Sequence, residues 1–338
     1  MAGTTRNVVP GAIENIPFKK PRRDVPLRES SHTAPRPPFR KYESHQELKS
    51  AVESSNIKDL FLMSNSTIGM CVGAKIGGDT CGENQEEVHQ EHTGEEDDCN
   101  ICGNFFKTFI QLKSDKLEQA TKQQSESVIW KESRRIRITA STANKVPKRS
   151  STNPDKFIRE HIFPRFQGNK ATKHGQTQEI HAKQFYSEHF KVCIEDRGSV
   201  MREDNKWLSA SPDGIIDGKE ILEVKCPDTS DLKLLFAGGK YDVKQDTNGS
   251  VFLDPKGQRG YYVQIQLTMY CCELEQAKLM IWKDRDEYQV VDVAYDQAFV
   301  TNTVERLKKF YFTKLLPRIV DDYAAKRLMI SSAYTALT

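Results

Sequence analysis

The chain lacks the long apolar segments that place a protein across a membrane. Its 338 residues contain no run of about 18 apolar side chains, the length that a transmembrane helix needs. The first residues also lack the apolar core of a secretory signal peptide. We therefore expect neither membrane insertion nor secretion, and the eight cysteines are expected to be thiols or metal ligands rather than disulfides.

Apolar side chains and net charge are also scarce. Apolar residues make up 37% of the chain, which is low for a fully globular protein, so part of the length is not expected to bury a core. The net charge is only +3, so bulk charge does not predict nucleic-acid binding, and any positive surface must be local.

Composition divides the chain into three parts. Residues 1–45 are rich in Pro, Arg, Lys and Ser, which predicts a disordered basic tail. Its basic cluster around Pro21 is interpreted as a nuclear-import signal, a phosphate contact or an ordinary charged segment. Residues 46–104 predict a small helix and a cysteine-containing acidic linker, and residues 105–338 predict a folded domain.

The linker raises the question of a zinc site. It contains four cysteines: Cys71, Cys81, Cys99 and Cys102. The last two have the spacing of half a tetrahedral zinc site, with His89 and His92 nearby, but the first two are too far apart to form a second short pair. Zinc is therefore one interpretation, and an acidic loop with incidental cysteines is the favoured one.

From residue 105 onward the pattern alternates between helix and strand. Helices are expected over 105–130, from about 139 to before Pro147, and over 175–190, 259–274, 297–315 and a stretch after 317. Strands are expected over 191–195, 206–210, 221–225, 277–283 and 288–295, with a polar insertion over 228–257. This order predicts an α/β domain whose mixed sheet carries helices on its faces.

The segment from Ser211 to Pro227 carries the strongest chemical signal. It places Asp213 at a turn and Glu223 and Lys225 in an apolar run, where alternate strand residues share a face. Two carboxylates can hold Mg²⁺, and an ammonium beside them orients water or offsets phosphate charge. The pattern indicates a metal-dependent phosphodiesterase.

These residues also have ordinary interpretations. Asp213 could form a common Pro-Asp-Gly turn, and Lys225 could cover a strand edge with its stem. A Glu–Lys pair in an apolar run, however, needs a partner that offsets desolvation, and a metal ion provides one. The acids in the following turn, Asp217 and Glu220, are not expected to be ligands.

Four separated blocks occur in an order that resembles a known family. They are Trp130 and Arg134 with residues 138–141, Gly175 with Glu179, Ser-Pro-Asp-Gly with Glu-Val-Lys, and residues 261–266 on a predicted helix. Over about residues 116–316, the chain resembles the YqaJ viral recombinase type, a lambda-exonuclease-like branch of the PD-(D/E)XK nucleases. The resemblance implies a restriction-endonuclease-like fold and Mg²⁺- or Mn²⁺-dependent DNA hydrolysis.

The resemblance implies a role for each matching residue of the metal site. Asp213 and Glu223, with the backbone carbonyl of Val224, are the implied metal ligands. Glu179 completes the site directly or through water, and Lys225 positions or activates the attacking water.

Further residues are implied to hold the lysine and the DNA. Gln264 supports the lysine and the substrate, and Tyr261 lies one helical turn before it. Arg134 and Ser141 are implied contacts for a 5′ phosphate, since arginine and a helix N-terminus both favour an anion. Two neighbouring arginines are alternatives to Arg134: Arg135 and Arg137.

The implied activity is 5′-to-3′ exonuclease action on duplex DNA ends in recombination, repair or a mobile element. A catalytically silent DNA-end-binding module and a structure-specific endonuclease on the same fold are the alternatives. Intact Asp213, Glu223 and Lys225 argue against the silent module. Ring-forming relatives imply a homo-oligomer and an annealing or recombination partner, and nuclear localisation is expected if the chain is eukaryotic.

Overall fold

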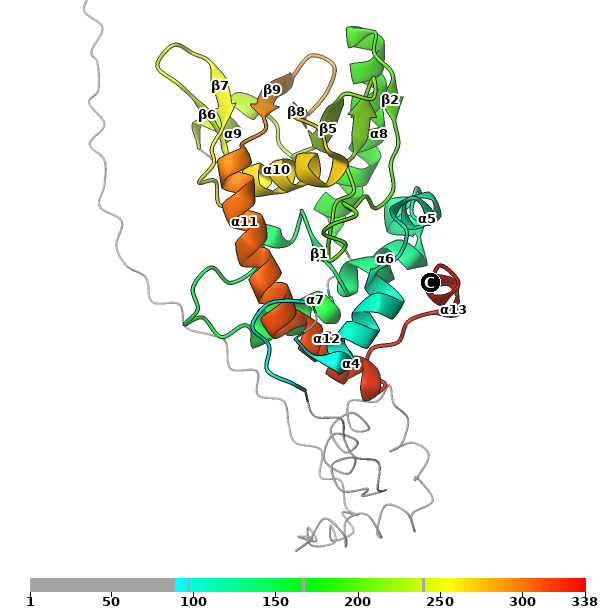
Figure 1. Cartoon of the computed structure of the whole chain (residues 1–338). Coiled ribbons are helices and arrows are strands. Elements are labelled where there is room, and N and C mark those ends of the chain that lie inside the picture. The colour runs from blue at the N-terminus through cyan, green and yellow to red at the C-terminus, as the bar shows by residue number, and fades with distance from the viewer. Residues whose placement is uncertain (1–88, 97, 166–167, 239–240) are drawn as a thin grey trace, which may run out of the picture. The chain divides into compact units, whose positions relative to one another are not determined.

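The computed structural model describes residues 89–96, 98–165, 168–238 and 241–338 (Figure 1). The predictions for the tail 1–45 and for Cys71 and Cys81 lie outside these residues, and the three-part division of the chain stays a prediction. No helix within the described ranges is long and apolar enough to cross a membrane.

A five-stranded mixed sheet forms the centre of the domain. Its strand order is β2 (Ile194–Glu195), β4 (Gly214–Ile216), β5 (Glu220–Lys225), β8 (Gln276–Trp282) and β9 (Tyr288–Ala294). Strands β5 and β8 pair in parallel, and the other neighbours pair antiparallel. The predicted α/β fold with a mixed sheet and flanking helices is confirmed.

Two helices cover the two faces of this sheet (Figure 1). Successive residues of β5 alternate between these helices, as the strand period requires. Leu222 and Val224 pack in the cluster that includes α8 (Lys170–Phe190), whereas Ile221 packs in the cluster that includes α10 (Tyr261–Cys272). Glu223 and Lys225 alternate with these residues and therefore share the α10 face of the strand.

A larger helical core lies beside the sheet. Its helices are α4 (Asn100–Phe105), η1 (Phe106–Ile110), α5 (Ser114–Ala120), η2 (Gln124–Glu126), α6 (Val128–Arg135), α7 (Asp155–Ile162), α11 (Gln297–Phe310), η4 (Tyr311–Leu315), α12 (Leu316–Ala324) and α13 (Ser332–Thr335). The segment predicted as a helix over 297–315 contributes Val300, Leu307 and Tyr311 to this core. A two-stranded parallel sheet, β1 (Ile138–Thr139) with β3 (Leu208–Ser209), joins it.

The single helix expected over 105–130 is wrong. The chain instead forms α4, the π-helical turn η1, α5, the 3-10 turn η2 and α6. Serine side chains lie at two of the starts, and one of them caps its helix. Ser114 donates to the Met201 carbonyl at 3.1 Å, and Ser127 accepts the Trp130 N–H at 3.2 Å as the N-cap of α6.

The helix expected from Thr139 to before Pro147 is also wrong. The Ile138 and Ala140 amides donate to the Trp207 and Ser209 carbonyls at 3.0 and 2.8 Å, so this segment pairs as a strand. Only the 3-10 turn η3 (Ala143–Lys145) follows.

Two strand and helix predictions need smaller corrections. The strand at 206–210 is β3, which belongs to the small sheet, and β4 was not predicted. Gly214 permits β4 because a Cβ there would lie 2.5 Å from Ile194 Cγ2. The helix predicted at 175–190 is confirmed as the longer α8, in which Ile180 and Phe190 are 68% and 42% exposed.

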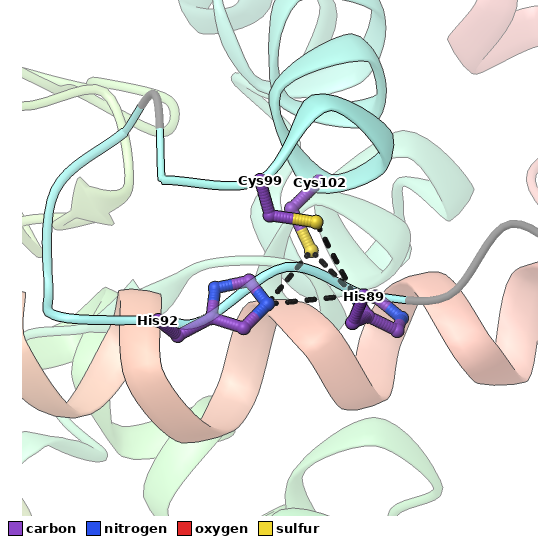
Figure 2. Close-up of side chains that lie close together, drawn as sticks. All are labelled: His89, His92, Cys99 and Cys102. Atoms are coloured by element: carbon purple, nitrogen blue, oxygen red, sulfur yellow. Dashed lines mark hydrogen bonds between the residues drawn. The ribbon is translucent and has the colours of Figure 1, made fainter.

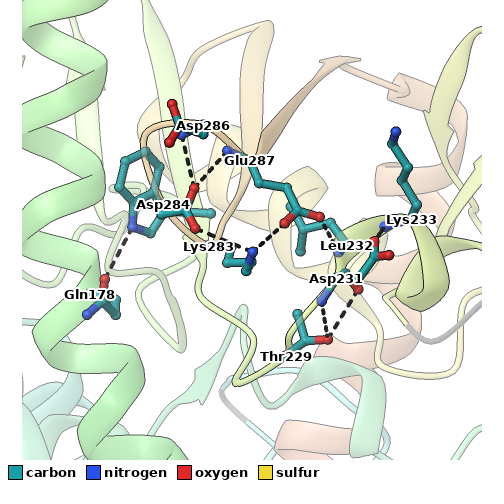
Figure 3. Close-up of polar contacts among 10 residues, drawn as sticks. Gln178, Thr229, Asp231, Leu232, Lys233, Lys283, Asp284, Asp286 and Glu287 are labelled. Atoms are coloured by element: carbon teal, nitrogen blue, oxygen red, sulfur yellow. Dashed lines mark hydrogen bonds and ion pairs between the residues drawn. The ribbon is translucent and has the colours of Figure 1, made fainter.

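The insertion 228–257 contains ordered elements rather than only polar loop. These are α9 (Leu232–Ala237), β6 (Val243–Gln245) and β7 (Val251–Leu253). Figure 3 shows α9 attached to the β8–β9 turn: the Leu232 amide donates to Glu287 Oε1 at 2.6 Å, and Lys283 pairs with Glu287 Oε2 at 2.5 Å. Apolar Leu232, Val243 and Leu253 extend the core under α10.

Candidate active site

Two carboxylates meet on the β4–β5 hairpin. Asp213 directly precedes β4, and its Oδ2 accepts the Val224 amide of β5 at 2.7 Å. Glu223 is 1% exposed, and its Oε1 accepts hydrogen bonds from Lys225 Nζ and, at 2.5 Å, from Gln264 Nε2. Its Oε2 is buried and has no hydrogen-bond partner among the described residues. Because a buried oxygen without a partner is costly, this atom marks a place for a cation or water.

Lys225 lies beside these acids and keeps its charge. Its Nζ donates to Glu223, lies 3.4 Å from the Val224 carbonyl oxygen and lies 5.3 Å from the centre of the Tyr261 ring. Burial opposes the charge, but the carboxylates of Glu223 and Asp213 outweigh it and raise the pKa of Lys225. The neighbouring carboxylates therefore favour the ammonium form, which donates a hydrogen bond to Glu223.

A third carboxylate comes from α8. Burial and the charge of Asp213 raise the pKa of Glu179 to about 7, and the same two causes raise the pKa of Glu223. Because the charge of Asp213 raises the pKa of both glutamates, Asp213, Glu179 and Glu223 form one electrostatic cluster. Trp282 Nε1 donates to Gln178 Oε1 at 3.4 Å, which holds this part of α8 against the sheet (Figure 3).

Helix α10 brings Gln264 and Tyr261 to the cluster from the other face of the sheet. The start of this helix is fixed by Asp242, a 5% exposed residue of the insertion that sequence reasoning did not single out. Its Oδ2 accepts the Gly260 and Tyr261 amides at 2.8 and 3.3 Å, a favourable position for an anion. Gly260, whose φ is +79°, allows the start of α10 to lie close to Asn144, because a Cβ at residue 260 would be only 2.5 Å from Asn144.

The predicted phosphate contacts also come together. Arg134 Nη2 donates to Ser141 Oγ at 2.9 Å, and its guanidinium lies 4.2 Å from the centre of the Trp130 ring. Trp130 Nε1 donates to Ser211 Oγ at 2.9 Å, so this cluster is attached to the loop that carries Asp213. The expected helix N-terminus at Ser141 is absent from the described chain, since only the turn η3 follows.

The structure distinguishes Arg134 from its two neighbours. Arg135 donates to the Ile162 carbonyl at 2.6 Å, and fully buried Arg137 donates to the Ile110 carbonyl at 2.9 Å and the Tyr334 hydroxyl at 2.6 Å. Both neighbours thus hold the backbone together. Burial lowers the pKa of Arg134 to about 10, and within the described residues no carboxylate forms an ion pair with it. Its charge is therefore available to an anion.

The donor set of the carboxylate cluster fits a hard divalent cation. Asp213, Glu223 and Glu179 offer carboxylate oxygens, and Val224 offers a carbonyl oxygen at the same strand. Oxygen donors without sulfur or imidazole suit Mg²⁺ or Mn²⁺ better than Zn²⁺. The unpartnered Glu223 Oε2 is the atom whose burial such a cation would offset.

The mixed sheet and its Asp–Glu–Lys cluster define a nuclease of the PD-(D/E)XK type, a phosphodiester hydrolase. Residues 129–275 match the family described as the YqaJ-like viral recombinase domain. This match confirms both the resemblance and the enzyme class predicted from the sequence. The search of curated proteins found no match.

Solved structures of exonucleases are similar to this chain. An alkaline exonuclease from Laribacter hongkongensis is 21% identical, covers 59% of this chain and 96% of its own, and has a TM-score of 0.45. The same enzyme in complex with dAMP is 20% identical, with 59% and 98% coverage and a TM-score of 0.44. A phage-related exonuclease from Haemophilus somnus 129PT is 15% identical, with 54% and 96% coverage and a TM-score of 0.40.

Proposed function

We propose that this chain is a Mg²⁺- or Mn²⁺-dependent exonuclease that degrades duplex DNA from a 5′ end during recombination, repair or the movement of a mobile element. The observation that carries the proposal is the buried, unpartnered Glu223 Oε2 next to Asp213 and the Lys225 ammonium. The match to a recombinase domain over residues 129–275 supports DNA as the substrate.

Each residue has a distinct task in this proposal. Asp213, Glu223, Glu179 and the Val224 carbonyl would hold the cation, which when bound stabilises charge on the phosphate and the leaving 3′ oxygen. Gln264 and Lys225 both donate to Glu223 Oε1, which leaves Oε2 free to face the cation.

The ammonium of Lys225 is a hydrogen-bond donor. The carboxylates of Glu223 and Asp213 raise its pKa, which favours this charged form. We infer that it orients the water through a hydrogen bond and offsets the negative charge that builds on the phosphate oxygens. The proton of the attacking water then leaves to solvent.

One nuclease assay separates the proposed function from its alternatives. The purified chain is incubated with end-labelled linear duplex and with closed circular DNA, in Mg²⁺ or in EDTA. We expect mononucleotides from the linear duplex only, and no product in EDTA. Cutting of closed circles would favour the endonuclease, and binding of DNA ends without product in Mg²⁺ or Mn²⁺ would favour the silent module.

Arg134→Ala is expected to slow the degradation of 5′-phosphorylated duplex by about tenfold to a hundredfold, the loss of one charge-assisted hydrogen-bonded contact. Its effect on 5′-hydroxyl duplex should be small, because that substrate has no terminal phosphate for Arg134 to bind. Initial rates on the two substrates provide the measurement. Arg149→Ala, which removes an exposed arginine, is the matched control. An equal loss on both substrates would contradict the 5′-phosphate role.

A further inference from the structure

A second cluster of metal-binding side chains lies at the α4–α12 end of the molecule, outside the carboxylate site (Figure 1). His89, His92, Cys99 and Cys102 each contribute one ligand atom, and these four atoms all lie within 4.8 Å of one another. Figure 2 shows both thiols and the His92 ring directed toward His89. Each cysteine is only 1% exposed, whereas the imidazoles are half-buried.

The distances within the cluster match those around a tetrahedral ion. His89 Nδ1 lies 3.4 Å from His92 Nε2, 3.5 Å from Cys99 Sγ and 3.4 Å from Cys102 Sγ, and Cys102 Sγ lies 3.8 Å from His92 Nε2. Tetrahedral Zn²⁺, with bonds of about 2.05 Å to nitrogen and about 2.3 Å to sulfur, separates two nitrogens by about 3.4 Å and nitrogen from sulfur by about 3.6 Å. Four of the six separations are close to these values and the other two are within 4.8 Å, so the set is compact enough to surround one ion.

Hydrogen bonds alone do not explain this packing. His89 Nδ1 has three neighbours, yet a ring nitrogen carries either one proton or one lone pair. The other ring nitrogen, Nε2, lies 3.0 Å from Asp321 Oδ1 of α12. An imidazole that donates from Nε2 to a carboxylate presents a bare lone pair at Nδ1, which is the usual arrangement of a histidine bound to a metal.

The surrounding backbone fixes the two halves of the cluster relative to each other. Asp98 Oδ2 accepts the amides of Thr93, Gly94 and Glu95 at 2.7, 2.7 and 2.9 Å, which closes the loop between the histidines and the cysteines. Gln90 Oε1 accepts the Asn100 amide at 2.8 Å at the start of α4. These hydrogen bonds hold described residues on both sides of the two ligand pairs.

We propose that His89, His92, Cys99 and Cys102 bind one Zn²⁺ in a closed tetrahedral site that fastens residues 89–104 to α12 through Asp321. Four protein ligands leave no open position, so the site is structural rather than catalytic. Its sulfur and imidazole donors select a different metal from the carboxylate cluster. The grouping predicted from the sequence is corrected in this respect: two histidines complete the Cys99–Cys102 pair, and Cys71 and Cys81 lie outside the described residues.

The metal content of the full chain tests this proposal independently of nuclease activity. Protein purified without chelators from zinc-supplemented medium is analysed by elemental mass spectrometry. We expect zinc equimolar with the chain, and loss of that zinc in the Cys99→Ser/Cys102→Ser double variant. Cys193→Ser, which removes an exposed cysteine, is the matched control and should retain zinc. Zinc-free wild-type protein, or zinc retained in the double variant, would overturn the proposal.

A second variant keeps the test informative if the double variant does not fold. Asp321→Asn retains all four ligands, and its zinc affinity is expected to fall by about tenfold to a hundredfold, as for other outer partners of a metal-bound histidine. Competition with a chromogenic chelator measures this affinity. Co²⁺ substituted for Zn²⁺ should give the intense d–d and thiolate charge-transfer bands of a tetrahedral site. An octahedral Co²⁺ spectrum, or an unchanged zinc affinity in Asp321→Asn, would contradict the proposed geometry.

Discussion

Lys225→Ala is expected to reduce nuclease activity by about a thousandfold while the domain stays folded. The lost ammonium is the donor beside Glu223, and no other described cation lies in hydrogen-bond contact with that carboxylate. The loss should appear in kcat at saturating DNA and Mg²⁺, because the proposed role is to orient water and offset charge during the reaction. Single-turnover rates on linear duplex provide the measurement.

Lys278→Ala is the matched control for this experiment. Lys278 lies on the neighbouring strand β8, but its ammonium pairs with Asp292 at 2.6 Å on β9 instead of with the carboxylate cluster. Its removal should leave activity within about twofold, since exposed ion pairs contribute little. Circular dichroism and the Tm verify folding of both variants. Full activity in Lys225→Ala would remove Lys225 from the site.

Arg137→Ala is expected to lower the free energy of unfolding by about 3–5 kcal/mol, the range for breaking a buried charged network. The fully buried guanidinium donates to the Lys206, Phe109 and Ile110 carbonyls and to the Tyr334 hydroxyl, at 2.9, 3.3, 2.9 and 2.6 Å. Truncation would leave a cavity and several acceptors without their donor. Urea-induced unfolding measures the change.

Arg134→Ala is the natural comparison, because it removes a half-buried arginine three residues away. Its described contacts are one hydroxyl and one aromatic ring, so its loss should cost about 1 kcal/mol at most. The two variants should therefore differ in what they change. Arg137→Ala lowers stability, and Arg134→Ala slows the degradation of 5′-phosphorylated DNA. A similar loss of stability in both would contradict the distinction between a structural and a substrate-facing arginine.

The sheet and the carboxylate cluster were predictable because local pattern and tertiary structure agree there. Residues 221–225, 277–283 and 288–295 combine apolar runs with turn residues, and all three form strands of the central sheet. Asp213, Glu223 and Lys225 lie within one hairpin, so alternation along a strand already placed them together. Their catalytic roles stay predictions, but their proximity did not depend on distant parts of the chain.

The errors arose where distant contacts decide the local structure. Residues 105–130 have a helical pattern, but Ser114 donates to the distant Met201 carbonyl, and the local cap at Ser127 starts a new helix. Thr139 looked like a helix start, yet its neighbours pair with a strand about 70 residues away. Asp242 had no local signal, because its hydrogen bonds run to amides at 259–261.

The hydrogen bonds that Asp242 accepts from the first turn of α10 connect the insertion to the helix that carries Gln264. A chimera that exchanged residues 228–257 for a shorter connection would remove the anion that anchors the Gly260 amide. The helix would then be free to tilt, and Gln264 would move relative to Glu223. A replacement segment would therefore have to bring its own acceptor to the start of α10.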